Sequence, residues 1–291
     1  MRIGYFPGCS LHATAREYDE SLKAVAAALD LELDEIKDWA CCGATSAHAT
    51  NRTLAIALAA RTLMLAEKQD LDSILAPCAA CYNRLATARR ALIHDSRMAE
   101  RIRSVLGYEF SHVVEVVNIA AFLNRSAAEI GRKVKKPLAG LKIACYYGCL
   151  LVRPPEVCRF DDCEAPQSME NIVSTLGGAP VRWNMALECC GGGFSLARTG
   201  SVVRLGRLIL QDALAAGAEA LLVACPMCHS NLDFRQQAML KHGGLGKAIP
   251  VIFVTELVGL SLGLDPDKLG LGRHFVSVQP LVERFGATRA G

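Results

Sequence analysis

The sequence predicts an α/β protein made of two similar domains, each built on a mostly parallel sheet. Short apolar segments of strand character alternate with helical patterns along the chain, which is typical of parallel sheets covered by helices. One pattern of five cysteines occurs twice and divides the 291 residues into units of about 140 residues. Between the units, residues 131–140 hold four basic residues, a proline and two glycines, which favours a solvated connection. We therefore expect domains at residues 1–135 and 136–291.

The elements of the first half follow from its hydrophobic spacing. Residues 2–6 have strand character and end at Pro7-Gly8, so Cys9 leaves the strand in a tight turn. Helical spacing covers residues 18–29 and stops before an acidic stretch. The later elements expected in this half are an extended segment at 36–40, a helix at 51–67, a strand at 73–76, a helix from Tyr82, a strand at 113–117 and a helix at 118–123.

The same order of elements begins again after the connection. Residues 141–149 repeat the strand, the turn glycine and the first cysteine. The later elements expected here are a helix at 169–176, an extended segment at 180–187, a helix at 201–215, strands at 220–224 and 249–254, and a helix at 256–262. Such alternation predicts a Rossmann-like sheet in each half, and ligands of such sheets bind outside the carboxyl ends of the strands. Every cysteine motif falls at such an end.

Ten of the 13 cysteines belong to the repeated pattern: a single cysteine, then Cys-Cys-Gly, then Cys-x-x-Cys. They are Cys9, Cys41, Cys42, Cys78 and Cys81 in the first half, and Cys149, Cys189, Cys190, Cys225 and Cys228 in the second. The gap before the adjacent pair is 31 residues in the first half and 39 in the second, and the gap after it is 35 and 34. A few unrelated buried thiols would not produce two matched sets.

The overall composition narrows the class of protein. A net charge of +3, with no run of basic residues interleaved with aromatics, argues against a nucleic-acid-binding surface. The apolar run at 249–264 is interrupted by Thr255 and Glu256 and is shorter than the roughly 20 residues of a spanning helix, so we expect no transmembrane segment. The first residues lack the pattern of a signal peptide. We therefore expect a cytoplasmic protein.

In the cytoplasm structural disulfides are rare, so this many cysteines indicate a metal site. A Cys-x-x-Cys at a strand-to-helix turn can place both sulfurs on one metal or cluster. Two adjacent cysteines chelate a single ion poorly, but they can bind separate irons of one larger cluster. A zinc ion or a cubane cluster takes four ligands, whereas each half offers five. A vicinal disulfide in each Cys-Cys pair and a zinc-stabilised scaffold remain alternatives.

The repeated motif, present twice over essentially the full chain, resembles the cysteine-rich CCG domain family, and specifically the B subunit of heterodisulfide reductase. The resemblance implies two noncubane [4Fe-4S] clusters, one in each half, with a disulfide substrate cleaved between them. Carried over to this chain, the five cysteines of each half would hold one cluster. The implied partners are an HdrC-like C subunit, which delivers electrons through cubane [4Fe-4S] clusters, and an HdrA-like A subunit that contains flavin.

Two interpretations of the activity stay open at this point. The leading one is an oxidoreductase subunit of sulfur metabolism that reduces or forms a disulfide. The other is an electron-transfer module of a respiratory or sulfur-oxidising complex without a disulfide substrate of its own. No dinucleotide fingerprint is present, because Gly191-Gly192-Gly193 lacks the required spacing, so electrons must come from a partner and the complex could be membrane-associated through it.

Four further residues are weaker candidates. His229 follows Cys228 directly and could tune its cluster or supply a proton, although a structural histidine is the plainer interpretation. Cys145 occupies the place that Tyr5 has in the first copy. Cys158 and Cys163 lie in an insertion at 150–166. We expect these three cysteines to be ordinary thiols, or the last two to contact a partner or protect against oxidation.

Overall fold

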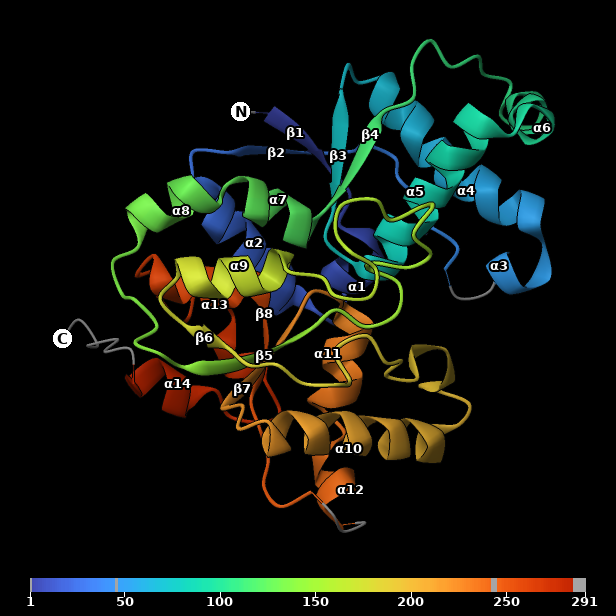
Figure 1. Cartoon of the computed structure of the whole chain (residues 1–291). Coiled ribbons are helices and arrows are strands. Elements are labelled where there is room, and N and C mark those ends of the chain that lie inside the picture. The colour runs from blue at the N-terminus through green and yellow to red at the C-terminus, as the bar shows by residue number, and fades with distance from the viewer. Residues whose placement is uncertain (1, 45–46, 242–244, 285–291) are drawn as a thin grey trace.

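Two four-stranded parallel sheets, one in each half, form the framework of the chain in this computed structural model (Figure 1). The structure describes residues 2–44, 47–241 and 245–284, so residues 285–291 of the expected second domain lie outside it. The first sheet has the order β2-β1-β3-β4 and consists of β1 (Arg2–Tyr5), β2 (Glu32–Glu35), β3 (Ser73–Ala76) and β4 (Glu115–Asn118). The second has the order β6-β5-β7-β8 and consists of β5 (Lys142–Tyr146), β6 (Ala179–Pro180), β7 (Ala220–Val223) and β8 (Val251–Phe253). The matching orders confirm the α/β fold with an internal repeat.

Helices connect the strands in both halves. Those of the first half are α1 (Gly8–His12), α2 (Arg16–Ala28), α3 (Ala47–Thr50), α4 (Arg52–Glu67), α5 (Ala79–His94), α6 (Ser96–Leu106), α7 (Ile119–Arg125) and α8 (Ala127–Lys133). Those of the second are α9 (Ser168–Thr175), η1 (Gly192–Phe194), α10 (Thr199–Ala215), α11 (Pro226–Leu232), α12 (Gln236–Lys241), α13 (Val254–Ser261), η2 (Leu271–Arg273) and α14 (Gln279–Arg284). Side-chain caps begin several of them, as where Asn51 accepts the Leu54 N–H at 3.0 Å.

The edge strand of each sheet differs from the sequence-based expectation. The first was expected at 36–40, but β2 is the acidic stretch before it, where Arg2 Nε donates to Asp34 at 3.0 Å across the strand pair. Asp38 then turns the chain with a φ of +59°. In the second half, the segment expected at 180–187 pairs with its neighbour only at Ala179–Pro180. The chain then leaves the sheet, and the Asn184 N–H donates to Asp212 of α10 at 2.7 Å.

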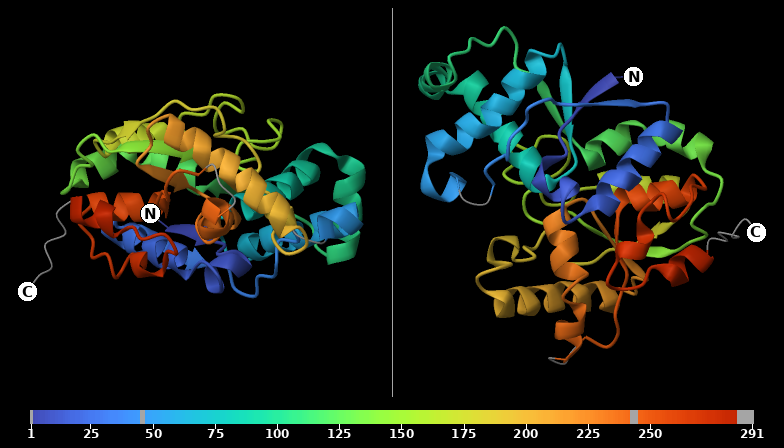
Figure 2. Two further views of the ribbon diagram at one scale, coloured as in Figure 1. Left: turned by 90° about the horizontal axis from the view of Figure 1, so that it is seen from below. Right: turned by 180° about the vertical axis from the view of Figure 1, so that it is seen from behind.

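Two pairs of helices pack the halves of the chain against each other. Helix α2, which follows the first strand of one half, packs against α13, which follows the last strand of the other. Helix α9 packs in the same way against α7 and α8 (Figure 2). The α2–α13 and α9–α7 contacts are therefore equivalent and are related by a pseudo-two-fold axis, as the two copies of a contact are in a symmetric dimer.

Two stacked aromatic rings lie where α2 meets α13, the region that we call the joint. The rings of Tyr18 in α2 and Phe253 at the end of β8 stack at 4.0 Å with an interplanar angle of 6°. Ser21 and Thr255 share a buried hydrogen bond of 2.7 Å beside them. One continuous hydrophobic core includes residues of both halves, so the domain division at residue 135 stays a prediction. Among the described residues, no helix is long and apolar enough to cross a bilayer.

Candidate metal centre

The predicted site residues of the first half all follow carboxyl ends of strands. Cys9 lies in α1 directly after β1, and the pair Cys41-Cys42 lies in the loop after β2. Cys78 follows β3 and precedes α5, while Cys81 lies in the first turn of that helix. Because the strands are parallel, these ends share one edge of the sheet. The fold therefore brings cysteines that are far apart in sequence to one place.

The sulfurs of the first half contact one another. The Sγ atoms of Cys42 and Cys81 lie 3.4 Å apart, and Cys81 is also hydrogen-bonded to Cys78. Cys41 is hydrogen-bonded to Cys9 and accepts the Gly43 N–H at 3.5 Å. Room for these sulfurs depends on glycine: Gly8 has a φ of +67°, and a Cβ there would lie 2.9 Å from Cys81 Sγ.

The second half repeats this arrangement. The Sγ atoms of Cys190 and Cys228 lie 3.5 Å apart, and Cys189 accepts the Gly191 N–H at 3.3 Å. Cys189 is also hydrogen-bonded to Cys149. A Cβ on Gly148, whose φ is +65°, would lie 3.3 Å from Cys228 Sγ. Each of the ten predicted residues therefore has a counterpart with equivalent contacts in the other half.

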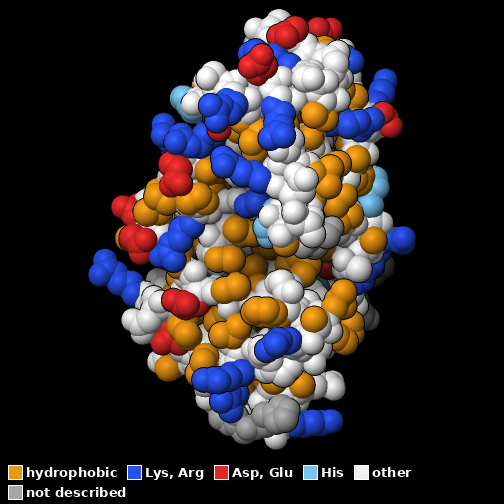
Figure 3. Space-filling model, turned by 90° about the vertical axis from the view of Figure 1, so that its right-hand side faces the viewer, with side chains coloured by type: hydrophobic (Ala, Val, Ile, Leu, Met, Phe, Trp, Pro, Cys, Tyr) orange, Lys and Arg blue, Asp and Glu red, His pale blue; other side chains and the backbone are white. Residues whose placement is uncertain are grey.

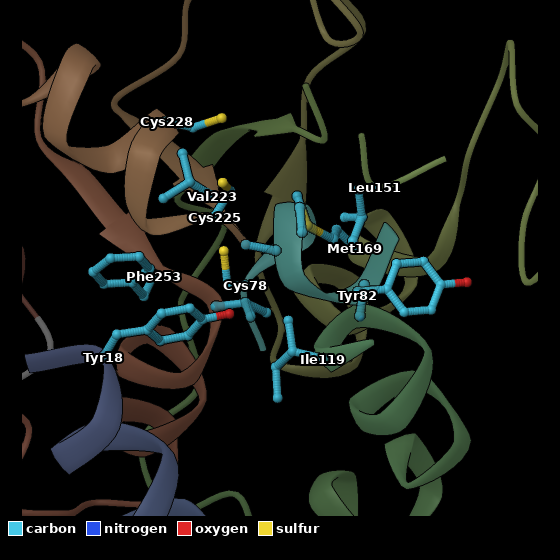
Figure 4. Close-up of a cluster of buried hydrophobic side chains, with 14 of the residues drawn as sticks. Tyr18, Cys78, Tyr82, Ile119, Leu151, Met169, Val223, Cys225, Cys228 and Phe253 are labelled. Atoms are coloured by element: carbon cyan, nitrogen blue, oxygen red, sulfur yellow. The ribbon is translucent and has the colours of Figure 1, made fainter. Parts of the chain in front are cut away.

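The two sets of cysteines meet at the centre of the molecule. Cys78 of the first half and Cys225 of the second are close enough to affect each other's ionisation, and Figure 4 shows both sulfurs beside the stacked rings of Tyr18 and Phe253. Both cysteines are buried. The outer members are more open, since Cys9, Cys41 and Cys189 are exposed. The ten sulfurs thus form one connected group with a buried middle and an accessible rim.

Hydrogen bonds between the sulfurs favour the thiolate at particular positions. Hydrogen bonding to Cys81 lowers the pKa of Cys42 to about 7, and hydrogen bonding to Cys149 lowers the pKa of Cys189 to about 6. Hydrogen bonds to Cys228 and Cys78 lower the pKa of Cys225 well below its usual value. The same interactions raise the pKa of the partner thiols Cys81, Cys149 and Cys228. Since the thiolate is the form that binds metal, a metal that binds here would displace protons from these partners.

The donor set fits an iron–sulfur cluster. Thiolates hold such clusters, and backbone N–H groups that bond sulfur tune them; here the N–H groups of Gly43 and Gly191 do so. Five sulfurs in each half exceed the four ligands of a tetrahedral zinc ion. All 13 cysteines are free thiols in the structure, so the donor set is complete in both halves.

His229 lies in the core rather than at the open rim of the site. Its Nε2 lies 3.1 Å from the Val251 carbonyl oxygen and 3.2 Å from His274 Nδ1, and its ring stacks on Phe253 at 4.3 Å. Burial lowers the pKa of His229 to about 3, so it is neutral at pH 7. These contacts support the structural interpretation of this residue over that of a proton donor.

The three cysteines outside the pattern contact other groups. Cys145 is buried in β5 near Glu170. Cys158 is buried in the insertion, where the Asn83 amide lies 3.4 Å from its sulfur, and burial raises the pKa of Cys158 to about 11. Cys163 is partly exposed beside Glu164. The same Asn83 amide donates to two carbonyl groups of the insertion, which therefore lies against α5 of the first half.

Sequence reasoning missed two polar residues that approach the sulfurs. Asn231 in α11 donates to the Cys190 carbonyl oxygen at 3.2 Å and approaches Cys190 Sγ at 3.7 Å. Arg84 in α5 lines a cleft of about 490 Å³ and acts electrostatically on Cys42. Each of these two residues stands three positions after the last cysteine of a Cys-x-x-Cys. An alignment of the two halves that included the residues next to the cysteines could therefore have identified Arg84 and Asn231.

The cleft beside Arg84 lies between α4, α5 and the insertion, and it is rich in basic residues. Its basic side chains are His48, Arg52, Arg84, Arg90 and His94. Figure 3 shows that Lys and Arg side chains gather over the upper part of this face, above a middle region of hydrophobic side chains. On this face (Figure 3), basic side chains outnumber the acidic ones in the upper part, and the middle is apolar.

Comparisons with known proteins agree with the motif and the fold. The family described as "Cysteine-rich domain" (CCG) matches residues 3–86 and 143–233. The 8-methylmenaquinol:fumarate reductase membrane anchor subunit of Wolinella succinogenes is 32% identical over 96% of this chain and 98% of its own length. The B subunit of the ferredoxin/F(420)H(2)-dependent CoB-CoM heterodisulfide reductase of Methanosarcina acetivorans is 30% identical over 94% of each chain.

A solved structure shares the fold at low identity. The crystal structure of a hypothetical protein from Helicobacter pylori has a TM-score of 0.76 and 13% identity, and it covers 95% of this chain. This chain spans only 52% of that protein. The resemblance to the B subunit of heterodisulfide reductase is confirmed by the relatives at about the 30% level. Because the family matches both copies of the motif, the chain belongs to the cysteine-rich CCG domain family.

Proposed function

We propose that the chain is the disulfide-acting subunit of a heterodisulfide reductase-like complex, with a noncubane [4Fe-4S] cluster in each half. The ten cysteines of the repeated pattern would be the ligands, five to each cluster. One observation carries the proposal: Cys78 of the first half lies beside Cys225 of the second (Figure 4). A disulfide has two sulfur atoms that must be separated, and two adjoining cysteine sites offer one site for each of them.

The proposed reaction is the reduction of a disulfide to two thiols, which consumes two electrons and two protons. The clusters would supply the electrons, one from each side of the S–S bond. On the buried side of the two sites, Cys78 and Cys225 and the stacked rings of Tyr18 and Phe253 keep the two halves in place. Protons would come from solvent on the exposed side, where Cys9, Cys41 and Cys189 lie. The reverse reaction would form the disulfide from two thiols, return both electrons and release two protons to solvent.

The electrons would come from partner subunits, as in the complexes that contain the related proteins. The proposed partners are an HdrC-like subunit with [4Fe-4S] clusters and an HdrA-like flavin subunit. The complex would lie in the cytoplasm, or it would associate with a membrane through these partners. Phe194 and Leu196, in the loop that follows Cys189 and Cys190, are 49% and 97% exposed. Apolar side chains so close to a candidate redox site suit contact with a partner.

A second candidate is an electron-transfer module that has no disulfide substrate. The similarity to the membrane anchor subunit of a fumarate reductase from Wolinella succinogenes favours this candidate. In that role the two clusters would pass electrons from one partner to another, and the proximity of Cys78 to Cys225 would shorten the path between them.

Cluster content and disulfide turnover test the proposal together. We expect about eight irons per chain after anaerobic loading, the content of two [4Fe-4S] clusters, and disulfide reduction with a reduced viologen dye as the electron source. Zinc without iron would overturn both candidates. Iron with no disulfide turnover, in the presence or absence of partner subunits, would exclude the first candidate and favour the second.

A further inference from the structure

The two cysteine sites are equivalent in their ligands but not in the charges around them. Aligning Cys81 with Cys228 places Arg84 opposite Asn231, and aligning the two Cys-Cys pairs places Ala40 opposite Glu188. The first half therefore has a cation where the second has a neutral amide. The second half has an acid where the first has a methyl group. At these two positions the first half is the more positive one. In the opposite sense, Arg235 of the second half aligns with Ala88 and donates to the Ser195 carbonyl oxygen at 2.6 Å.

In the second half, the amide of Asn231 takes the place beside the inner sulfur. Asn231 is 1% exposed, accepts the Ser195 hydroxyl at 3.0 Å and approaches Cys190 Sγ at 3.7 Å. Its Nδ2 also donates to the Cys190 carbonyl oxygen at 3.2 Å. These contacts show that the position three residues after the Cys-x-x-Cys faces the sulfur of the adjacent pair.

In the first half, Arg84 occupies that position. It is half-buried, lies one turn after Cys81 on α5, and is held by a hydrogen bond from its guanidinium to Asn83 Oδ1. Its positive charge acts on Cys42, the counterpart of Cys190. A guanidinium does not lose its charge in proteins, so this cation is permanent.

Glu188 adds a contribution of the opposite sign in the second half. It directly precedes Cys189, and its backbone carbonyl oxygen accepts the Tyr146 hydroxyl at 2.6 Å, which fixes this part of the chain. Its negative charge therefore stands next to Cys189 in the chain and acts on this sulfur with the opposite sign to that of a cation. Because Glu188 is exposed, solvent screens its charge and its influence is smaller than that of half-buried Arg84.

We propose that Arg84 and Glu188 set the first-half cluster at a higher reduction potential than the second-half cluster. This inference rests on the proposed function, because it requires a cluster in each half. Reduction adds negative charge to a cluster, which a nearby cation stabilises and a nearby carboxylate opposes. If both clusters are bound, an electron that reaches the pair would reside mainly in the first half, and reduction of the second half would require a lower potential.

The test is a redox titration of the cluster-loaded full chain, followed by EPR and absorbance. Arg84→Asn, which copies the second half, should lower only the higher midpoint. We expect about a tenfold fall in the ratio of reduced to oxidised first cluster at a fixed potential, which is about 59 mV for a one-electron couple. Glu188→Ala, which copies the first half, should raise only the lower midpoint by a smaller amount. The double variant should have the smallest separation.

Matched variants separate charge from structure. Arg84→Lys keeps the charge and should restore the wild-type higher midpoint, and Arg97→Asn removes an exposed cation of α6 and should move neither. Ala40→Glu, the reciprocal change, should lower the higher midpoint. If Arg84→Asn fails to load its cluster, Glu188→Ala and Ala40→Glu test the same inference.

Two failures are distinguishable in this experiment. A wild-type chain that binds no iron overturns the proposed function itself. A chain with two clusters whose midpoints do not respond to Arg84→Asn, Glu188→Ala or Ala40→Glu retains the proposed function and overturns only the electrostatic inference.

Discussion

Replacing His274 by alanine tests how the joint beneath the cysteine sites is stabilised. His274 Nε2 lies 2.8 Å from Glu256 Oε1, and both side chains are 0% exposed. The other carboxylate oxygen of Glu256 accepts the Phe253 N–H at 2.7 Å. Burial alone would lower the pKa of His274, but the hydrogen bond and charge of Glu256 raise it above the usual value. Glu256 lies in α13, the helix that packs against α2 of the other half.

The expected loss follows from leaving one buried charge without its partner. Removing one member of a buried ion pair costs about 3–5 kcal/mol in the free energy of unfolding. The loss should depend on pH. Burial already raises the pKa of Glu256, and without the imidazole this pKa rises further, so the folded variant prefers the protonated acid. Stability conferred by such protonation is lost as pH rises through the folded pKa, so the deficit should be larger at pH 7 than at pH 5.

The assay is denaturant unfolding followed by circular dichroism at both pH values, with His112→Ala as the matched control. His112 Nδ1 lies 3.7 Å from Glu67, but its side chain is 49% exposed. Glu67 also keeps backbone N–H bonds of 2.7 and 3.1 Å from residues 111 and 112. The control should therefore lose less than about 1 kcal/mol. Equal losses in the two variants would refute the reasoning about the buried pair.

Four further predictions concern the cysteine sites and the joint. Cys42→Ala or Cys190→Ala should damage one cluster and abolish disulfide turnover, measured by iron content and activity; full activity would remove the two-cluster proposal. Cys158→Ala should keep the wild-type iron content, because its sulfur contacts the insertion and α5. Gly8→Ala should impair loading of the first-half cluster, since a Cβ there meets Cys81 Sγ at 2.9 Å. Tyr18→Ala should lower the free energy of unfolding by about 3–5 kcal/mol, as for other buried aromatics.

The sequence was sufficient for the inner strands of both sheets and for the gathering of the cysteines. Strand positions such as 73–76 followed from apolar runs, and parallel connectivity then placed the cysteines at one edge of each sheet. The edge strands were harder, because β2 is an acidic segment whose pairing depends on Arg2. Helix α8 was also missed, since its basic last turn resembled a linker.

Contacts between the halves could not be predicted from spacing. The stacking of Tyr18 on Phe253 joins residues 235 positions apart, and nothing in the local pattern of either segment indicates its partner. The insertion was recognised as an insertion, but its position against Asn83 depends on three contacts with the other half. Such tertiary contacts decide which site residues are buried. Burial in turn decides how strongly charges such as that of Arg84 act on the sulfurs.

The pseudo-two-fold arrangement explains why the two sites adjoin. Cys78 and Cys225 each stand two residues after the inner strand of their sheet, β3 or β7. When α2 packs on α13 and α9 on α7, the carboxyl ends of the two sheets approach each other, so equivalent residues meet at the axis. A duplicated domain with one cysteine site thus acquires a double site by symmetric packing. Differences beside the sulfurs, such as Arg84 and Glu188, can then distinguish the halves without separating them.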